Sequence, residues 1–395
     1  MFERHLVAEL AERLQEERDF IQILVGPRQT GKSTAISQML EHIDMPYHLV
    51  AADDPSLGSS EWLASEWRRA RALTEDGTRD ALFIVDEIQK VPHWAAMVKK
   101  MWDEDTRSKM CLKVLLTGSS SLLLQKGMED SLMGRFEVIY SLHWNYPECA
   151  QAFGYSLEDF LFYGGYPGAA KRKDDTARWA RYLQTSIVNP TIAQDVLEME
   201  RVEKPALLKA LFTIGSAYSA QEISYTKMMG QLQDAGNTTT IAHYLDLLDK
   251  AGMLRGLQKY AQDTARIRRS SPRLMVHDTS LMTYSQGASR DLLLSDPEKR
   301  GHLVESAVGA YLIARSTQDD FDLFWWRTKN GDEVDFLLRK SSLLTAIEVK
   351  SGRIKGTSGL QEFLKLNPSA SSLVIGSAHC SLEDFLSGNI PLFVV

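Results

Sequence analysis

One stretch near the start of the chain constrains the fold more than any other. Residues 20–43 read FIQILVGPRQTGKSTAISQMLEHI, which is an apolar strand, a glycine-rich turn and a helix. The turn, GPRQTGKS, matches the phosphate-binding pattern G-x-x-x-x-G-K-[S/T] at every fixed position and lies between a strand and a helix, as that pattern requires. The stretch therefore predicts an α/β fold with a P-loop. The alternative, a glycine-rich turn in an unrelated fold, does not account for the flanking strand and helix.

The loop supplies the groups that phosphate oxygens need. Gly26 and Gly31 allow the backbone to curl so that successive N–H groups point inward, and the helix that begins near Lys32 adds its positive end. We expect Lys32 to reach the β and γ phosphates of ATP, and Ser33 to ligate Mg²⁺. The residues predicted to bind the nucleotide are Gly26, Pro27, Arg28, Gln29, Thr30, Gly31, Lys32, Ser33 and Thr34.

Two later strands end in polar residues that suit the same site. The apolar run ALFIVDEIQ contains Asp86, which we expect to hold Mg²⁺ through water, and Glu87, which would orient or deprotonate the attacking water. The next strand, CLKVLLTGSSS, ends near Thr117 and Ser119, from where a polar side chain can sense the γ-phosphate. For Ser119 the alternative, that it helps to cap the following helix, stays open.

A single arginine follows these strands in the segment SLMGRFEVI. Arg135 comes after a glycine and directly before another apolar strand. An arginine there could neutralise charge on a nucleotide bound by a neighbouring subunit, which would require a homo-oligomer. The alternative is a surface residue with no role in catalysis.

The composition indicates a soluble chain of two to four domains. Of its 395 residues 44% are hydrophobic and 25% are charged. No apolar run approaches the roughly 18 residues that cross a bilayer, and the amino terminus is charged rather than signal-like. We therefore expect a cytoplasmic protein with no membrane partner. The net charge of −7 disfavours nonspecific nucleic-acid binding, but residues 262–395 are neutral in sum, so this part neither demands nor forbids a polyanion.

The middle of the chain is predicted to be helical. The glycines and the proline of GGYPG, residues 164–168, interrupt the helical pattern and predict a hinge within a helical lid. Residues 203–261 read helix, short helix, helix, strand, which is the order of a winged helix-turn-helix. The third of these helices carries two aspartates, and acids that face phosphates lower DNA affinity. We favour a structural or protein-contact role for this module over DNA reading, and regard the run ARIRRSSPR as the better basic patch.

Two apolar strands in the last third of the chain carry charged residues at fixed places. Asp335 begins one run, and Glu348 and Lys350 alternate with apolar residues in the next, so all three could share one face of a sheet. Glu305 lies among apolar residues at helical spacing, where burial of a carboxylate is costly unless it has a partner or a function. The alternative is that Asp335 caps a strand while Glu348 pairs with Lys350 on a solvated face.

Several of these segments together resemble one protein family. The segments GPRQTGKST, LFIVDEIQKVPHW, LLTGSSS, the Gly-Arg before FEVI, and FLFYGGYPGA are similar to those of prokaryotic AAA-type ATPases that carry a C-terminal domain of unknown function, number 4143. In that family the C-terminal part resembles restriction endonucleases, and HLVESAVGAYLIAR, WWRTKNGDEVDF and AIEVKSG match its pattern. The domains then predicted are an AAA-type core over residues 1–150, a helical lid over 151–202, a winged helix over 203–261 and a nuclease-like α/β domain over 262–395.

The resemblance implies a second metal site and a partner. Glu305, Asp335 and Glu348 would hold Mg²⁺ or Mn²⁺, while Lys350 would stabilise charge that develops on a phosphodiester. It implies a nucleic-acid partner, with DNA favoured, and control of the nuclease-like domain by the nucleotide state of the P-loop. The alternative is a degenerate nuclease fold that only binds, which would make the protein an ATP-driven switch for a protein or nucleic-acid partner.

Overall fold

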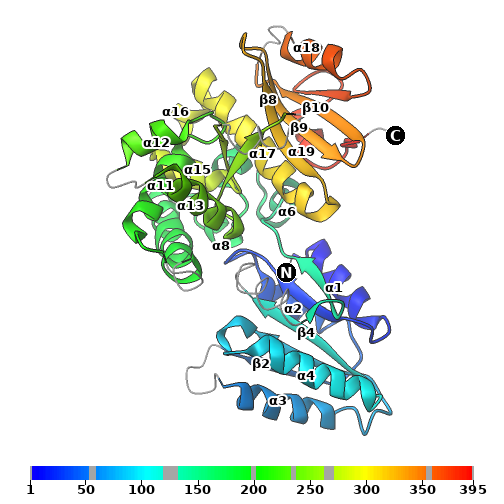
Figure 1. Cartoon of the computed structure of the whole chain (residues 1–395). Helices are drawn as coiled ribbons and strands as arrows, with labels where there is room; N and C mark the ends of the chain where they lie inside the picture. The colour runs from blue at the N-terminus through cyan, green and yellow to red at the C-terminus, as the bar shows by residue number, and fades with distance from the viewer. Residues whose placement is uncertain are drawn as a thin grey trace. The chain divides into compact units, whose positions relative to one another are not determined.

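The chain folds into two compact units that are described separately. The computed structural model describes residues 2–52, 59–118, 132–196, 202–232, 237–261, 271–352 and 358–393. The units comprise residues 1–142 and 143–395, and Figure 1 shows the elements of each. Within the ranges given above, every helix is too short or too polar to cross a bilayer.

The first unit is built on a five-stranded sheet in the order β2-β3-β4-β1-β5. All neighbouring strands are parallel, so their carboxyl ends meet at one edge of the sheet. Strand β4 lies between β1 and β3, with Leu24 of β1 opposite Thr117 of β4. The strands are β1 (Ile21–Val25), β2 (Tyr47–Ala51), β3 (Ala81–Asp86), β4 (Leu112–Gly118) and β5 (Phe136–Tyr140).

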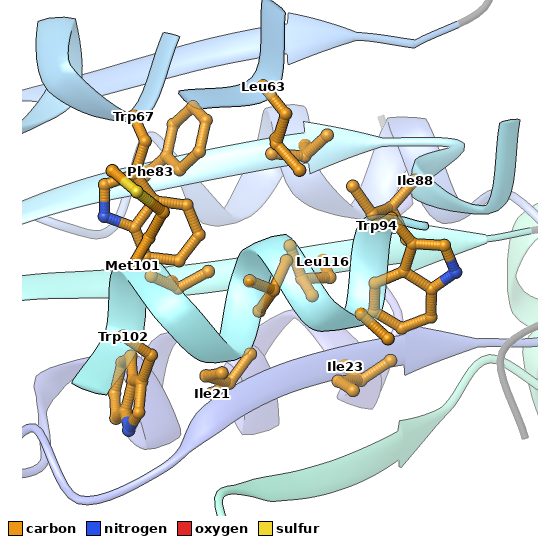
Figure 2. Close-up of a cluster of buried hydrophobic side chains, with 14 of the residues drawn as sticks. Ile21, Ile23, Leu63, Trp67, Phe83, Ile88, Trp94, Met101, Trp102 and Leu116 are labelled. Atoms are coloured by element: carbon orange, nitrogen blue, oxygen red, sulfur yellow. The ribbon is translucent and has the colours of Figure 1, made fainter. Parts of the chain in front are cut away.

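Helices cover both faces of this sheet, which explains why its central strands are apolar throughout. Successive side chains of a strand point to opposite faces, so Ile23 packs toward α3 and α4 while Leu24 packs toward α1 and α2. Figure 2 shows Trp67, Phe83 and Met101 in the first of these two cores. Fully burying a large apolar side chain contributes about 1.5–3 kcal/mol, so the two cores fix the strand ends firmly. The helices are α1 (His5–Gln15), α2 (Lys32–Met39), α3 (Ser60–Ala72) and α4 (Trp94–Arg107), with a 3-10 turn η1 (Ile88–Lys90) after β3.

The second unit begins with helices that pack against one another and against later ones. Helix α7 contacts both α15 and α17, and α11 contacts α15 and α13. Asp278, the N-cap of α15, accepts hydrogen bonds from the Gly165 and Ser280 N–H groups, and burial raises the pKa of its carboxyl. These elements are α6 (Tyr146–Phe153), α7 (Leu157–Tyr163), α8 (Pro167–Ala170), α9 (Thr176–Tyr182), the π-helical turns η3 (Leu183–Val188) and η4 (Thr191–Val196), α11 (Pro205–Ala217), α12 (Tyr225–Gln231), α13 (Thr238–Lys250), α15 (Thr279–Gln286) and α16 (Arg290–Ser295).

A six-stranded mixed sheet in the order β11-β10-β9-β8-β6-β7 completes this unit. Strands β8, β9 and β10 form an antiparallel meander, whereas β6 and β11 pair in parallel with β8 and β10. Helix α18 packs on one side over Phe324, Leu337 and Ala346. The elements are β6 (Leu254–Lys259), β7 (Arg273–Val276), α17 (Pro297–Asp319), β8 (Asp322–Arg327), β9 (Glu333–Lys340), β10 (Leu343–Val349), α18 (Ser358–Leu366), β11 (Ser371–Ile375) and α19 (Leu382–Leu386).

Two of the domain boundaries predicted from the sequence fall within the second unit, one inside a helix and one between two paired strands. The boundary predicted at 150/151 lies inside α6, and α6 belongs to the second unit. The boundary predicted at 261/262 lies between β6 and β7, which are antiparallel neighbours in one sheet. Helices α11, α12 and α13 followed by β6 keep the element order predicted for 203–261, but β6 also pairs with β8, which lies in the region predicted as a separate domain over 262–395.

Candidate functional sites

The P-loop has the backbone shape that its sequence predicts. It connects the end of β1 to the start of α2, and Gly31 takes a left-handed conformation at a φ of 94° directly before the helix. A Cβ on Gly26 would collide with the carbonyl group of Ser141, so this close approach requires glycine. The N-cap residue of α2 is Gly31, which has no side chain that could cap the helix.

Lys32 lies within this loop rather than on the surface. Its ammonium group donates hydrogen bonds of 2.9 Å to the carbonyl oxygens of Gly26 and Pro27. Thr30 is buried, and its hydroxyl donates to the Pro27 carbonyl oxygen over 3.0 Å. The lysine charge and the helix amino terminus therefore converge on one small region, which is the combination that binds phosphate.

Three strand ends meet beside the P-loop and bring the predicted polar residues together. The hydroxyl of Ser33 donates to Asp86 Oδ2 over 3.4 Å, and the hydroxyl of Thr117 donates to the other oxygen of the same carboxylate. The N–H of Glu87 also donates to this carboxylate, so Asp86 is held by three neutral donors and none of them is a cation. The paired Ser33 and Asp86 oxygens are the hard ligands that Mg²⁺ takes with a nucleotide, so the residues present fit a Mg–nucleotide site.

Glu87 stands next to Asp86 in an unusual backbone conformation. Its φ of 55° and ψ of 42° are left-handed, which is rare for a residue with a side chain. The side-chain amide of Gln89 donates to Glu87 Oε2 over 2.5 Å. Sequence reasoning placed Glu87 here but missed Gln89. The signal was present, because Gln89 follows two residues later in the turn that ends the strand.

The two other residues predicted for this unit are Ser119 and Arg135. Ser119 lies outside the described residues. Arg135 makes a paired contact with Asp103 of α4, with Nε–Oδ1 and Nη2–Oδ2 distances of 2.8 and 3.2 Å. Its carbonyl oxygen accepts from the N–H of Ile21, the first residue of β1. Arg135 therefore lies at the amino edge of the sheet, about 16 Å from the P-loop by the length of one strand.

The second unit gathers the charged residues that the sequence singled out. Asp335 lies on β9 beside the end of β10, where its Oδ2 accepts the Val349 N–H over 2.7 Å. Glu348 is buried and forms an ion pair with Lys350. Glu305 reaches the same region from α17, since Nη1 of Arg273 is 2.8 Å from Glu305 Oε1 and 3.6 Å from Asp335 Oδ1. All four residues predicted for this site therefore lie together.

A fifth residue, which sequence reasoning had placed in a surface basic patch, lies among these acids. Arg273 begins β7, and only 4% of its side chain is exposed. Its guanidinium is 2.8 Å from Glu305 Oε1 and 3.6 Å from Asp335 Oδ1, and it also pairs with Glu333. Burial raises the pKa of Glu305, and the charge of Arg273 opposes that shift. The preceding residues of the basic run, 262–270, lie outside the described residues.

This arrangement does not fit a divalent metal ion. The described ranges contain no group of three His, Cys, Asp or Glu side chains positioned to hold one. Each predicted metal ligand already contacts a donor, namely Arg273 at Glu305, Arg273 and a backbone N–H at Asp335, and Lys350 at Glu348. The carboxylates are together, but a guanidinium stands between two of them.

The two aspartates of helix α13 contact basic residues of the second unit. Asp249 accepts from the Arg255 guanidinium over 2.8 Å and from His277 over 2.7 Å, and Asp246 pairs with Lys250. Burial acts to raise the pKa of the Asp249 carboxyl, but the charges and hydrogen bonds of Arg255 and His277 together outweigh it and leave the pKa lowered. Arg255, which lies on β6 after this helix, is therefore engaged by an acid of its own unit.

Three family models match successive parts of the chain. Residues 18–150 match a family model described as an AAA domain, residues 154–292 match a domain of unknown function (DUF8612), and residues 300–386 match a domain of unknown function (DUF4143). An uncharacterized protein of Mycobacterium tuberculosis is 26% identical over 83% of this chain and 69% of its own length. One from Methanocaldococcus jannaschii is 24% identical over 80% of this chain and 72% of its own length. Among solved structures, the fold resembles a Walker-type ATPase of Pyrococcus abyssi at 16% identity, with a TM-score of 0.50 over 72% of this chain and 96% of that chain.

Proposed function

Since this chain is a prokaryotic AAA-type P-loop ATPase with a DUF4143 domain near its carboxyl end, we propose that its nucleotide state controls DNA binding by the nuclease-like domain. ATP binding and hydrolysis follow from the AAA domain. The observation that carries the assignment to residues is the contact of Ser33 and Thr117 with one carboxylate, Asp86, beside Lys32.

The roles of the ATPase residues follow from these positions. Lys32 leaves the Gly26 and Pro27 carbonyl oxygens to bind the β and γ phosphates, and the amino terminus of α2 binds the same oxygens through its N–H groups. Ser33 and Asp86 hold Mg²⁺, which, when bound, neutralises charge on the phosphates. Glu87 accepts a proton from the attacking water, and Gln89 keeps the Glu87 carboxylate in place.

Two substitutions separate nucleotide binding from hydrolysis. Lys32→Ala is expected to abolish ATP binding, measured with a fluorescent ATP analogue, because it removes the principal positive charge of the loop. Glu87→Gln is expected to preserve binding but to lower phosphate release by about 10²-fold or more, because an amide cannot accept the proton. Normal hydrolysis by the Glu87→Gln variant would show that another group is the base.

The proposal for DNA rests on the chemistry of the second unit. Asp335, Glu348 and Lys350 lie together on an antiparallel strand pair, as in the restriction-endonuclease-like pattern that their sequence resembles. Because Arg273 already neutralises part of this cluster, we propose that the domain binds DNA without cutting it. This favours the switch interpretation over the nuclease interpretation.

The test compares DNA binding and DNA cleavage in defined nucleotide states. Binding of double- and single-stranded DNA is measured for the Glu87→Gln variant with ATP and for the Lys32→Ala variant, and the two affinities are expected to differ. Supercoiled plasmid incubated with Mg²⁺ or Mn²⁺ is expected to stay intact. Nicking that disappears in Asp335→Ala would overturn the binding-only proposal, and absence of DNA binding in both states would indicate a protein partner.

A further inference from the structure

Arg273 occupies the centre of the carboxylate cluster in the second unit. Its guanidinium is within 4 Å of carboxylate oxygens from two elements, 2.8 Å from Glu305 of α17 and 3.6 Å from Asp335 of β9. Glu333 of β9 pairs with the other terminal nitrogen of the same guanidinium. One buried positive charge therefore serves three acids that lie far from it in the sequence.

The surroundings hold the guanidinium firmly in this position. The backbone of Arg273 pairs with that of Leu257 of β6. On its other side it forms an isolated antiparallel β-bridge with the backbone of Glu222. Its guanidinium carbon lies 5.1 Å from the centre of the Trp325 ring, a distance at which a cation is attracted to an aromatic face. Backbone pairing and the indole thus fix both ends of the side chain.

We infer that Arg273 is the resident cation of this cluster and that it excludes a divalent metal ion from a latent site formed by Asp335 and Glu348. A divalent ion bound to Asp335 would lie within a few ångströms of the guanidinium, and like charges at that distance repel strongly when they are shielded from water. Asp335 also has its Oδ2 engaged by the Val349 N–H, so Arg273 faces the remaining oxygen.

One carboxylate oxygen of the cluster has no hydrogen-bond donor among the described residues and would be available to an ion once Arg273 is removed. Glu348 is buried, and its Oε2 has no hydrogen-bond donor among the residues that the structure describes. A buried carboxylate oxygen without a donor is costly, and a metal ion or a water molecule would satisfy it. Glu348 is next to Asp335 across the β9–β10 pair, so removal of Arg273 would leave two adjacent carboxylates for one ion.

The inference is tested by Mn²⁺ titration of the full-length protein without nucleotide, with free Mn²⁺ followed by electron paramagnetic resonance. The wild type is expected to show no Mn²⁺ binding that depends on Asp335. Arg273→Met keeps an apolar stem against Trp325 but removes the charge, and it is expected to gain one Mn²⁺ per chain, bound at least about tenfold more tightly than by the wild type. Adding Asp335→Asn to that variant is expected to abolish the gain.

Arg339→Met is the matched control. Arg339 lies on β9 in an ion pair with the exposed Asp322 and near the Phe324 ring, so its replacement removes an arginine from the same sheet without touching the cluster. It is expected to bind Mn²⁺ as the wild type does. A gain of equal size in this control would show that the effect is general charge removal, and would overturn the inference.

The titration stays decisive if Arg273→Met fails to fold. Arg273→Lys keeps one positive charge but loses the planar fork that reaches several carboxylates, and it is expected to show a smaller gain of Mn²⁺ affinity. The wild type itself provides the strongest refutation, because Mn²⁺ binding by the wild type that is lost in Asp335→Asn would show that Arg273 excludes nothing. No DNA or ATP enters these measurements, so their outcome is separate from that of the DNA-binding proposal.

Discussion

Asp86 ends β3 and Asp335 lies near the start of β9, but the two carboxylates have different kinds of partner. Asp86 accepts hydrogen bonds from the hydroxyls of Ser33 and Thr117, which orient the carboxylate and leave its charge intact. Asp335 lies 3.6 Å from the guanidinium of Arg273, which cancels part of its charge. Hydroxyl donors prepare a carboxylate for an incoming cation, whereas a resident cation occupies the place that such an ion would take.

The largest effect is expected where the buried cation is removed. Arg273→Met leaves Glu305, Glu333 and Asp335 without their shared partner, and breaking a buried ion pair typically costs about 3–5 kcal/mol. Amide hydrogen exchange in peptides from residues 271–352 measures the loss locally. Arg339→Met, which removes an exposed pair, is expected to cost less than about 1 kcal/mol. Equal losses in the two variants would show that the buried ion pairs of Arg273 contribute no more to stability than the exposed pair of Arg339.

The two aspartates are expected to differ sharply in the ATPase reaction. Asp86→Asn removes the charge that two hydroxyls keep available, and phosphate release is expected to fall by about 10²–10³-fold. Asp335→Asn is expected to leave phosphate release unchanged within about twofold, because Asp335 belongs to the second unit and not to the P-loop site. A large loss in Asp335→Asn would show that the second unit influences hydrolysis directly, through energetic coupling between the Asp335 cluster and the P-loop site.

A smaller effect is expected for the neutral donor that holds Glu87. Gln89→Ala removes the 2.5 Å contact to Glu87 Oε2, and kcat is expected to fall about tenfold with KM unchanged, because binding of the nucleotide does not use this amide. Gln22→Ala is the matched control, since Gln22 donates to Glu137 over 3.2 Å on the same sheet but away from the P-loop. A rise in KM for Gln89→Ala would point to nucleotide binding instead of base positioning.

The sequence was sufficient wherever the chemistry depends on neighbours along the chain. The P-loop is a strand, a turn and a helix in succession, and Asp86 and Glu87 follow their strand directly, so local patterns predicted all of these. The pair Glu348 and Lys350 needs only the two-residue repeat of a strand, which places both on one face.

Contacts between distant strands could not be predicted in this way. Arg273 reaches Asp335 across 62 positions of sequence, because β7 pairs with β6 and β6 pairs with β8. No local pattern separates this buried arginine from the basic residues that precede it. The boundary within α6 has the same origin, since α6 packs on α7 of the second unit although it follows the last strand of the first closely.

The smallest effect is expected for Arg135, and it concerns the only arginine that sequence reasoning assigned to catalysis. Both Arg135 and Asp103 are about one-third exposed, and such pairs contribute less than about 1 kcal/mol. Arg135→Ala and Asp103→Ala are therefore each expected to change phosphate release less than about threefold. The decisive comparison is between phosphate release by the two variants as the protein concentration is raised. A loss of about 10²-fold or more in Arg135→Ala but not in Asp103→Ala would restore an arginine finger that acts on a neighbouring subunit.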